Sequence, residues 1–391
     1  MFSKATSAVF RVALSLSRTG LAFLALLSVA SCNVSGFARV PPLPEGVAQQ
    51  GGIAVLEPVT LNGSKQHIQI RAHNPKAPLL LYLSGGPGGS EMAWLRHYHP
   101  ELERHFVVIH WDQRGAAKSY AAADWSNISP QLYLEDAGEL IAQLLDRFNR
   151  ECLLVVGNSW GSILGVRVAA RWPEQLCGYV GVTQQVNVIE TDQLGWQRTL
   201  ARARKNRTTD DIKTLEELGE PPYLGDDFAT RSIKLIRLQD RYGGTAQSRS
   251  AGSDQMQVAL RAPEYSWWDR FNFFRGLYKA WKLVYPQLAT LDLETEVPEL
   301  EVQVWLLLSH DDITVPPEPA VRWLNALKAP QKKIIWFDNA GHTLTIDAAK
   351  RFDDVLINHV LPAISTRAQR STNNRSSTSY FNTSMIEEAT S

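Results

Sequence analysis

The sequence predicts an α/β protein in which a mostly parallel sheet is covered by helices on both faces. Two observations predict this class. Short uninterrupted apolar runs, typical of buried interior strands, alternate with longer amphipathic stretches of helical spacing. The alternation stops between residues 185 and 291, where only helical patterns occur, and then resumes. The 391-residue chain is therefore expected to build a sheet-based core with a helical insertion.

The first part of the core is predicted over residues 51–184. It opens with two partly alternating strands separated by Asn62-Gly63-Ser64, a hairpin signal, and continues with apolar runs. Each later run is followed by a loop or by a helical pattern, which indicates parallel strands. The predicted strands are Ile53 to Leu61, His67 to Ala72, Leu79 to Leu83, Phe106 to Trp111, Leu153 to Val156 and Tyr179 to Val182, and the predicted helices are Leu132 to Phe148 and Ile163 to Trp172.

The helical insertion at residues 185–291 is predicted to be a lid, because an insertion after the carboxyl end of a strand lies over that edge of the sheet. Several of the chain's 12 tryptophans fall in this insertion. They could line a binding site or simply pack in the core, and the sequence does not decide between the two. The predicted helices are Asp192 to Lys205, Asp210 to Leu218, Phe228 to Tyr242 and Trp267 to Leu283.

The second part of the core is predicted over residues 292–365, and residues 366–391 are predicted to be a disordered tail because they are rich in Ser, Thr and Asn. The second part repeats the strand and helix pattern of the first. It holds the strands Val302 to Leu308 and Lys333 to Phe337, a helix near Glu318 to Leu327 and a last helix from about Asp347 to Val360.

The N-terminus is predicted to be a targeting segment. Three basic residues precede the apolar stretch Leu21 to Ala30, and small residues follow it, which is the order of a secretory signal over residues 1–31. Val29-Ala30-Ser31-Cys32 also resembles a bacterial lipobox, so Cys32 is a candidate lipidation site beside plain secretion or an uncleaved anchor. Residues 32–50 are a predicted linker. The domain is expected to be exported, secreted or attached to a membrane through its N-terminus.

Charge and cysteine content narrow the class of partner. Lysine plus arginine equals aspartate plus glutamate, at 40 each, so nothing in the net charge points to nucleic acid or an acidic surface as a partner. Cys152 and Cys177 each precede a predicted strand; a disulfide is open, but two buried thiols are the expected state. Three widely spaced cysteines support neither a zinc cluster nor cysteine-based catalysis, and no metal or organic cofactor is expected.

Leu153 to Leu164 holds the first candidate for chemistry. The strand Leu153 to Val156 leads into Gly157-Asn158-Ser159-Trp160-Gly161, which matches the G-x-S-x-G pattern of a nucleophile elbow. A serine on so sharp a turn has strained backbone, and its neighbours two positions away must be glycine to avoid clashes. A structural Gly/Ser turn is the alternative. With a strand before it and a helix after it, Ser159 is predicted to be a nucleophile at a helix N-terminus.

A glycine-rich loop follows an interior strand earlier in the chain. Ser84-Gly85-Gly86-Pro87-Gly88-Gly89-Ser90 comes directly after Leu79 to Leu83. So many glycines let backbone N–H groups approach a ligand closely, which an oxyanion hole requires, although a plain turn is the alternative.

Asp312 and His342 complete a candidate triad with Ser159. Each follows a predicted strand, so both are expected at the carboxyl edge of the sheet, where Ser159 lies. The chain order Ser, Asp, His is that of an α/β-hydrolase. His342 would act as general base, and Asp312 would fix its tautomer and stabilise the imidazolium. Asp311 competes for the acid role, but the spacing to Pro316 favours Asp312.

At this point the chain resembles the proline iminopeptidases and related α/β-hydrolase aminopeptidases. Ser84 to Gly88, Asp112 to Ser119 and Gly157 to Ser162 are similar to their His-Gly-Gly-Pro-Gly, Asp-Gln-Arg-Gly and Gly-x-Ser-Trp-Gly-Ser motifs, and Ala340 to His342 matches Ala-Gly-His. The resemblance covers roughly Ile53 to Leu361 and is weak in the insertion. It implies an α/β-hydrolase fold with a helical lid.

The resemblance also implies site residues. An oxyanion hole would be formed by the backbone N–H groups of Gly86 and Trp160, and lid carboxylates would hold a substrate's amino group. Glu264 and Asp269, which lie among aromatic residues, are candidates for that role, with a solvated or helix-capping role as the alternative for each. The sequence departs from the family pattern where Ser84 replaces the motif's histidine.

The Asp-Gln-Arg-Gly motif is expected to act structurally. On the resemblance, Asp112 and Arg114 would pair with each other and hold the loops behind the site.

Three functions remain open from the sequence. The first is a serine aminopeptidase that forms an acyl-enzyme on Ser159 and releases an N-terminal residue from small peptides. The second keeps the triad but acts on an ester or lactone, which needs no partner for an ammonium group. The third is an exported, non-catalytic binding protein on a hydrolase scaffold, which the complete triad argues against.

Overall fold

The computed structural model describes residues 38–223, 225, 227–243 and 255–365. They form an eight-stranded sheet in the order β1-β2-β4-β3-β5-β6-β7-β8. β2 pairs antiparallel with β1 and β4, and the remaining neighbours are parallel. The strands are β1 (Ile53–Leu61), β2 (Ser64–Ala72), β3 (Leu79–Leu83), β4 (Val107–Asp112), β5 (Leu153–Asn158), β6 (Leu176–Val182), β7 (Val304–Leu308) and β8 (Lys332–Trp336).

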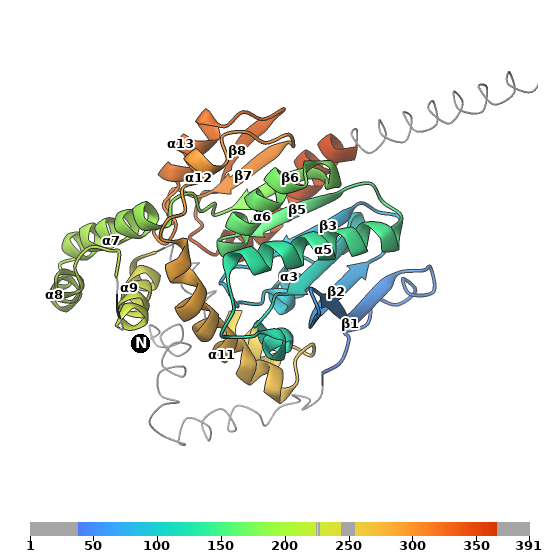
Figure 1. The fold of residues 1–391 in the computed structure, drawn as a ribbon, viewed down its shortest axis with the longest axis horizontal. Helices are drawn as coiled ribbons and strands as arrows, with labels where there is room; N and C mark the ends of the chain where they lie inside the picture. The colour runs from blue at the N-terminus through green and yellow to red at the C-terminus, as the bar shows by residue number, and fades with distance from the viewer. Residues whose placement is uncertain (1–37, 224, 226, 244–254, 366–391) are drawn as a thin grey trace, which may run out of the picture.

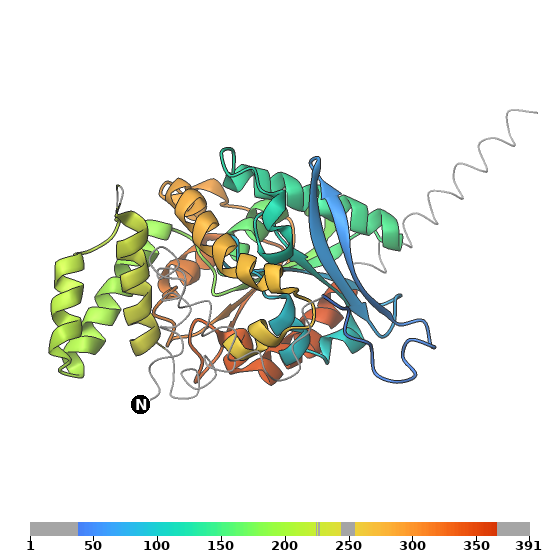
Figure 2. The same cartoon turned by 90° about the horizontal axis from the view of Figure 1, so that it is seen from below.

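The interior strands are apolar throughout because both faces of the sheet are covered. In β3, Leu79, Leu81 and Leu83 pack into one hydrophobic cluster, whereas Leu80 and Tyr82 pack into a second. Successive side chains of a strand point to opposite faces, so the uninterrupted run fills two cores. Figure 2 shows the sheet between α5 on one side and the C-terminal helices on the other.

Helices follow most of the strands, as the predicted alternation requires. α5 begins after Ser129, whose side chain accepts a hydrogen bond from the Leu132 amide, with proline in the first turn. The helices of the core are α3 (Met92–Tyr98), α4 (Leu102–His105), α5 (Pro130–Phe148), α6 (Trp160–Arg171), α12 (Leu293–Glu296), α13 (Glu318–Ala326), α14 (Leu344–Asp347) and α15 (Ala349–Val355), with the 3-10 helices η2 (Ala117–Ala122) and η3 (Pro173–Gln175) and the π-helix η5 (Leu356–Val360). A further 3-10 helix, η4 (Tyr285–Leu288), follows α11 in the insertion.

The segment between β6 and β7 is helical, as predicted. Figure 1 shows α7, α8 and α9 grouped at one side of the sheet and α11 below the strands. The group has its own hydrophobic cluster, with Leu200, Leu215 and Leu238 among its buried residues. The helices are α7 (Val188–Lys205), α8 (Thr209–Leu218), α9 (Phe228–Tyr242) and α11 (Trp267–Val284).

The predicted strands and long helices are all present, with boundary shifts of a few residues. The largest difference concerns the last helix, which divides into α14, α15 and η5. The sequence did not predict α3 and α4, which are too short to show a helical period.

Cys152 and Cys177 form a disulfide, so the expectation of two buried thiols is wrong. β5 and β6 are parallel neighbours, with Leu153 opposite Leu176. The two cysteines therefore reach the same end of adjacent strands, with Cα atoms 5.2 Å apart. This separation lies within the range that a disulfide spans.

The predicted signal at residues 1–31, Cys32 and the predicted tail at residues 366–391 lie outside the described residues. Within the described part of the chain, none of the helices is long and apolar enough to cross a bilayer.

Candidate functional site

Ser159 occupies a sharp turn between β5 and α6. Its φ of 52° and ψ of −116° place it outside the regions that L-residues prefer. A hydrogen bond from the Ser159 amide to the Val182 carbonyl (3.0 Å) holds the turn against β6. The side chain thus stands at the carboxyl edge of the sheet and at the N-terminus of α6, as the elbow pattern predicts.

The two glycines of the elbow are required by close backbone contacts. A Cβ atom on Gly157 would lie 2.3 Å from the Gly161 carbonyl oxygen, and one on Gly161 would lie 2.0 Å from the Leu83 carbonyl oxygen. Because these neighbours are backbone atoms, they have no rotamer to move aside. The clash predicted from the sequence is therefore present on both sides of Ser159.

His342 and Asp312 contact each other directly. His342 Nδ1 lies 3.0 Å from Asp312 Oδ2, and the other carboxylate oxygen accepts hydrogen bonds from the amides of Thr314 and Val315, each 2.9 Å long. Burial lowers the pKa of His342, but the charge and hydrogen bond of Asp312, with smaller contributions from Asp240 and Glu91, outweigh it. The pKa of His342 therefore lies above its ordinary value of 6.5.

Asp312, and not Asp311, is the aspartate that contacts His342. Asp311 forms an ion pair with Arg202 (3.3 Å) on α7. Ser309, three residues before Asp312, is buried and donates a hydrogen bond to the Ala340 carbonyl (2.7 Å). This bond joins the loop that carries Asp312 to the loop that carries His342.

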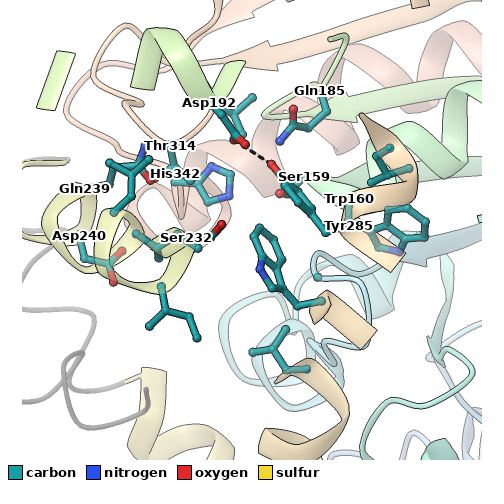
Figure 3. Close-up of a pocket in the computed structure, with 18 of the residues that line it drawn as sticks. Ser159, Trp160, Gln185, Asp192, Ser232, Gln239, Asp240, Tyr285, Thr314 and His342 are labelled. Atoms are coloured by element: carbon teal, nitrogen blue, oxygen red, sulfur yellow. Dashed lines mark hydrogen bonds between the residues drawn. The ribbon is translucent and has the colours of Figure 1, made fainter. Parts of the chain in front are cut away.

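Ser159 and His342 line one cavity of about 270 Å³. Figure 3 shows their side chains at its centre, with residues of α7, α9 and the end of α11 around them. Within the described chain, no hydrogen bond joins the Ser159 hydroxyl to His342. Catalytic contacts of this kind are often loose without substrate and tighten when it binds. Apolar and aromatic side chains cover most of the wall, including Ile163, Ile233, Leu277, Trp281 and Leu288.

The described wall of the cavity carries acidic residues and neither lysine nor arginine. Asp192, on α7, is half-buried and accepts a hydrogen bond from the Tyr285 hydroxyl (2.8 Å), the dashed line in Figure 3. Burial raises the pKa of Asp192 to about 7, although that hydrogen bond opposes the rise. Asp240, on α9, stands at the exposed rim. The cavity therefore offers a carboxylate with no basic partner, which suits a cationic ligand.

Gly86 and Trp160, the expected oxyanion-hole residues, both line the cavity with Ser159. Trp160 is the first residue of α6, where backbone N–H groups have no partner within the helix. Gly86 has a φ of 140°, and a Cβ atom there would lie 2.6 Å from the Gly89 nitrogen, so only glycine fits. The structure thus brings both backbone positions to the nucleophile turn.

Glu91 holds the loops on which these residues stand, and the sequence analysis missed it. Its carboxylate accepts hydrogen bonds from the Gly85 amide (2.8 Å), the Asn158 side chain (3.0 Å) and the Tyr82 hydroxyl (2.6 Å). Gly85 precedes Gly86, and Asn158 precedes Ser159, so one carboxylate positions both loops. A signal existed, since an acidic residue directly follows the glycine loop.

Ser84, the departure from the motif's histidine, is also part of this loop arrangement. Its hydroxyl lies 2.8 Å from His110 Nε2 and accepts a hydrogen bond from the Glu91 amide (3.2 Å). The serine thus anchors the start of the glycine loop to β4 and to Glu91.

Asp112 and Arg114 do not pair with each other, so that expectation is wrong. Arg114 forms a buried two-bond ion pair with Asp136 on α5, with both N–O distances 2.8 Å. Asp112 instead accepts hydrogen bonds from the Ser90 hydroxyl and the Lys118 amide (3.1 Å). Gln113 Oε1 also accepts a hydrogen bond from the Trp160 indole (3.0 Å). The three residues of the motif thus bond to three different segments around the site.

Glu264 and Asp269 are not brought to the cavity, and neither lines it. Glu264 is fully buried and pairs with Arg96. Asp269 forms a capping box with Ser266 at the start of α11 and an ion pair with Lys118 (2.9 Å). Both carboxylates already have cationic partners. The prediction that they bind a substrate's amino group is therefore wrong. The acidic residues that line the cavity are instead Asp192 and, at its exposed rim, Asp240.

Comparison with known proteins gives the family. A family profile described as the alpha/beta hydrolase fold matches residues 78–349. The probable aminopeptidase YbaC of Bacillus subtilis (strain 168) is 28% identical over 316 residues, covering 80% of this chain and 98% of that protein. The putative carbamate hydrolase RutD of Serratia proteamaculans (strain 568) is 33% identical over 289 residues, covering 73% of this chain and 92% of that protein.

A solved structure shows the same fold. The proline iminopeptidase-related protein TTHA1809 from Thermus thermophilus matches with a TM-score of 0.55 and 21% sequence identity, covering 80% of this chain and 98% of that one. The matched profile spans more than half of the chain and includes the glycine loop, the Asp-Gln-Arg-Gly motif and the elbow. The protein therefore belongs to the α/β-hydrolase family, as its motifs predict.

Proposed function

We propose that the protein is a serine aminopeptidase that releases the N-terminal residue of small peptides through an acyl-enzyme on Ser159. The observation that carries this proposal is the carboxylate of Asp192 in the wall of the cavity that holds Ser159 and His342, where no described lysine or arginine opposes it. The name of the B. subtilis relative, probable aminopeptidase, supports the same reading.

In the proposed reaction, the Ser159 Oγ attacks the carbonyl carbon of the substrate's first residue while its proton passes to His342 Nε2. Asp312, bonded to Nδ1, stabilises the imidazolium. The N–H groups of Gly86 and Trp160 bind the oxyanion, and the C–N bond breaks as His342 returns the proton to the leaving amine. Water, deprotonated by His342, then attacks the carbonyl carbon of the ester. The C–Oγ bond breaks as His342 returns that proton to Ser159 Oγ, and the free amino acid leaves.

Asp192 would bind the substrate's α-ammonium group. A carboxylate whose pKa is raised by burial gains most from a cation, because the cation offsets the cost of its lost hydration. The apolar and aromatic wall beside it would hold the side chain of the first residue. Together they would select, for attack by Ser159, a first residue with a free α-ammonium group and an uncharged side chain.

A substrate panel distinguishes the proposed aminopeptidase from an esterase. The second candidate is retained because one relative is named a putative carbamate hydrolase. Aminoacyl-arylamides with a free α-amine are expected to be cleaved at least about tenfold faster, by kcat/KM, than the same compounds with an acetylated amine, because the ion pair with Asp192 is lost. p-Nitrophenyl esters serve as the comparison. Equal rates on free and acetylated substrates, with fast ester cleavage, would establish an esterase instead.

The pH dependence of the reaction should follow His342. The imidazole must be neutral to accept the Ser159 proton, and its pKa lies above 6.5, so kcat should fall as pH drops through that raised value. Stability moves in the opposite direction. The raised pKa of His342 adds to the free energy of unfolding. This addition is fully present below pH 6.5 and is lost as pH rises through the pKa of the folded state. Rate profiles from pH 5 to 9 on an uncharged ester measure the first effect, and a kcat that is flat across this range would remove His342 as base.

A further inference from the structure

The start of α11 exposes an aromatic pair that the site does not use. Among the described residues, large apolar side chains are exposed at three positions: Val40 (37%), Trp267 (41%) and Trp268 (73%). Val40 follows Arg39, whose amide donates a hydrogen bond to the Pro263 carbonyl (2.8 Å) four residues before Trp267, so the two segments are adjacent. Single exposed apolar side chains are ordinary, but a group that includes two adjacent tryptophans marks an interaction surface.

The two indoles are held outward by a rigid helix start. Ser266 and Asp269 form a capping box, and Lys118 pairs with Asp269 (2.9 Å), so the first turn of α11 is fixed to η2. Trp267 lies beneath the Arg270 guanidinium, 5.2 Å from it, and Trp268 meets the ring of Phe271 edge-on. A surface ordered in advance loses little conformational entropy when it binds.

The charge of α11 is strongly basic. Its one carboxylate, Asp269, is already paired and Arg270 is buried, whereas the exposed Arg275 and Lys282 and the half-buried Lys279 follow along the helix. Arg275 is exposed and lies over the rings of Tyr120 (4.5 Å) and Phe271 (5.2 Å). Exposed tryptophan together with arginine and lysine on one helix is the composition of helices that lie at anionic membrane interfaces.

We propose that Val40, Trp267, Trp268, Phe271 and Arg275, here named the α11 docking surface, bind the surface of a membrane that contains anionic phospholipids. The indoles would enter the headgroup region, where an apolar ring and a polar N–H are both accommodated, and the basic residues would contact lipid phosphates.

The path of the chain favours a membrane over a protein partner. The predicted lipidation site Cys32 lies seven residues before Arg39, and Arg39 is bonded to Pro263 beside the surface. At about 3.3–3.6 Å per extended residue, an anchored Cys32 would hold this face within about 25 Å of the bilayer. The Cys152–Cys177 disulfide agrees with an exported protein.

Vesicle binding by the full chain carrying Cys32→Ser tests the surface without the lipid. The probes are phosphatidylcholine vesicles with and without phosphatidylglycerol. The protein is expected to co-sediment with the anionic vesicles, and adding Trp267→Ser and Trp268→Ser should lower the partition coefficient about tenfold or more through lost apolar burial. Arg275→Glu should weaken binding. Arg204→Glu is the control, because it makes the same charge change at an exposed residue of α7, and it should leave binding unchanged.

Three results would overturn the proposal. One is a Cys32→Ser chain that stays in the supernatant with both kinds of vesicle. Another is equal binding with and without the two tryptophans, which would assign any binding to the signal segment. The third is a dimer, seen by sedimentation velocity without lipid, that the tryptophan substitutions convert to a monomer. Unchanged melting temperature and unchanged ester hydrolysis in the tryptophan variant show that its fold and site are intact.

Discussion

Replacing Ser159 by alanine is expected to lower kcat/KM by about 10⁴-fold or more, because it removes the nucleophile while the oxyanion donors and the cavity remain. Stability should change little. The alanine Cβ occupies the place of the serine Cβ at a φ of 52°, so the backbone strain is the same in both proteins. Steady-state kinetics on a free-amine arylamide and a thermal melt measure the two quantities.

Ser232→Ala is the matched control for this experiment. Ser232 is buried and lines the same cavity from α9, so its loss removes a hydroxyl of the wall without touching the elbow. Its kcat should stay within a few-fold of wild type. A fluorophosphonate probe gives an independent readout, since the wild type should be labelled and the Ser159→Ala protein should not. Retained turnover in Ser159→Ala, or an unlabelled wild type that is folded, would remove the acyl-enzyme mechanism.

Asp192→Asn is expected to weaken binding of free-amine substrates by about tenfold to a hundredfold, the usual range for losing a charge-assisted hydrogen bond from a partly buried site. The asparagine has nearly the same shape, and its carbonyl still accepts the Tyr285 hydroxyl bond. Binding is best measured by titration of the Ser159→Ala protein, in which no turnover occurs. The affinity for acetylated analogues should be unchanged.

The effect of pH on this binding has a definite sign. The pKa of Asp192 is about 7 without substrate, so the carboxylate that pairs with the ammonium group becomes populated as pH rises. Affinity for a free-amine substrate should therefore increase from pH 5.5 to about 7, below the pKa of about 7.7–8.0 at which an α-ammonium group loses its proton, and lose this dependence in Asp192→Asn. Tyr285→Phe is the comparison, because it keeps the carboxylate but removes the hydrogen bond that lowers its pKa, so the rise in affinity should move to higher pH and not disappear. Equal affinity in wild type and Asp192→Asn would move amine recognition to another residue.

The elements of the core were predictable because their signals are local. β3, β5 and β7 are short apolar runs, and burial on both faces leaves no other composition for them. The elbow was also local, since the clashes that exclude side chains at Gly157 and Gly161 arise from backbone only a few residues away or on the neighbouring strand. The placement of Asp312 and His342 at the same edge then followed from strand direction alone.

Contacts between distant segments were not predictable. Nothing near Arg114 in the sequence indicates that its partner is Asp136 on α5, and nothing near Glu264 indicates that Arg96 neutralises it. From the sequence alone, Arg114 is a charged residue within a motif and Glu264 is a charged residue among aromatic residues. Only the folded chain shows that Glu264 already has its cation, whereas Asp192 has none on the described wall of the cavity.

By itself, then, the sequence determined the sheet, the turn that carries Ser159 and the order of the triad residues, because each depends on backbone geometry over a few consecutive residues. The tertiary structure decided which aspartate meets His342, that Cys152 joins Cys177, and which carboxylate faces the substrate cavity. These outcomes depend on side chains from elements tens to hundreds of residues apart. Their energies come from desolvation and partner choice, which exist only once the chain has packed.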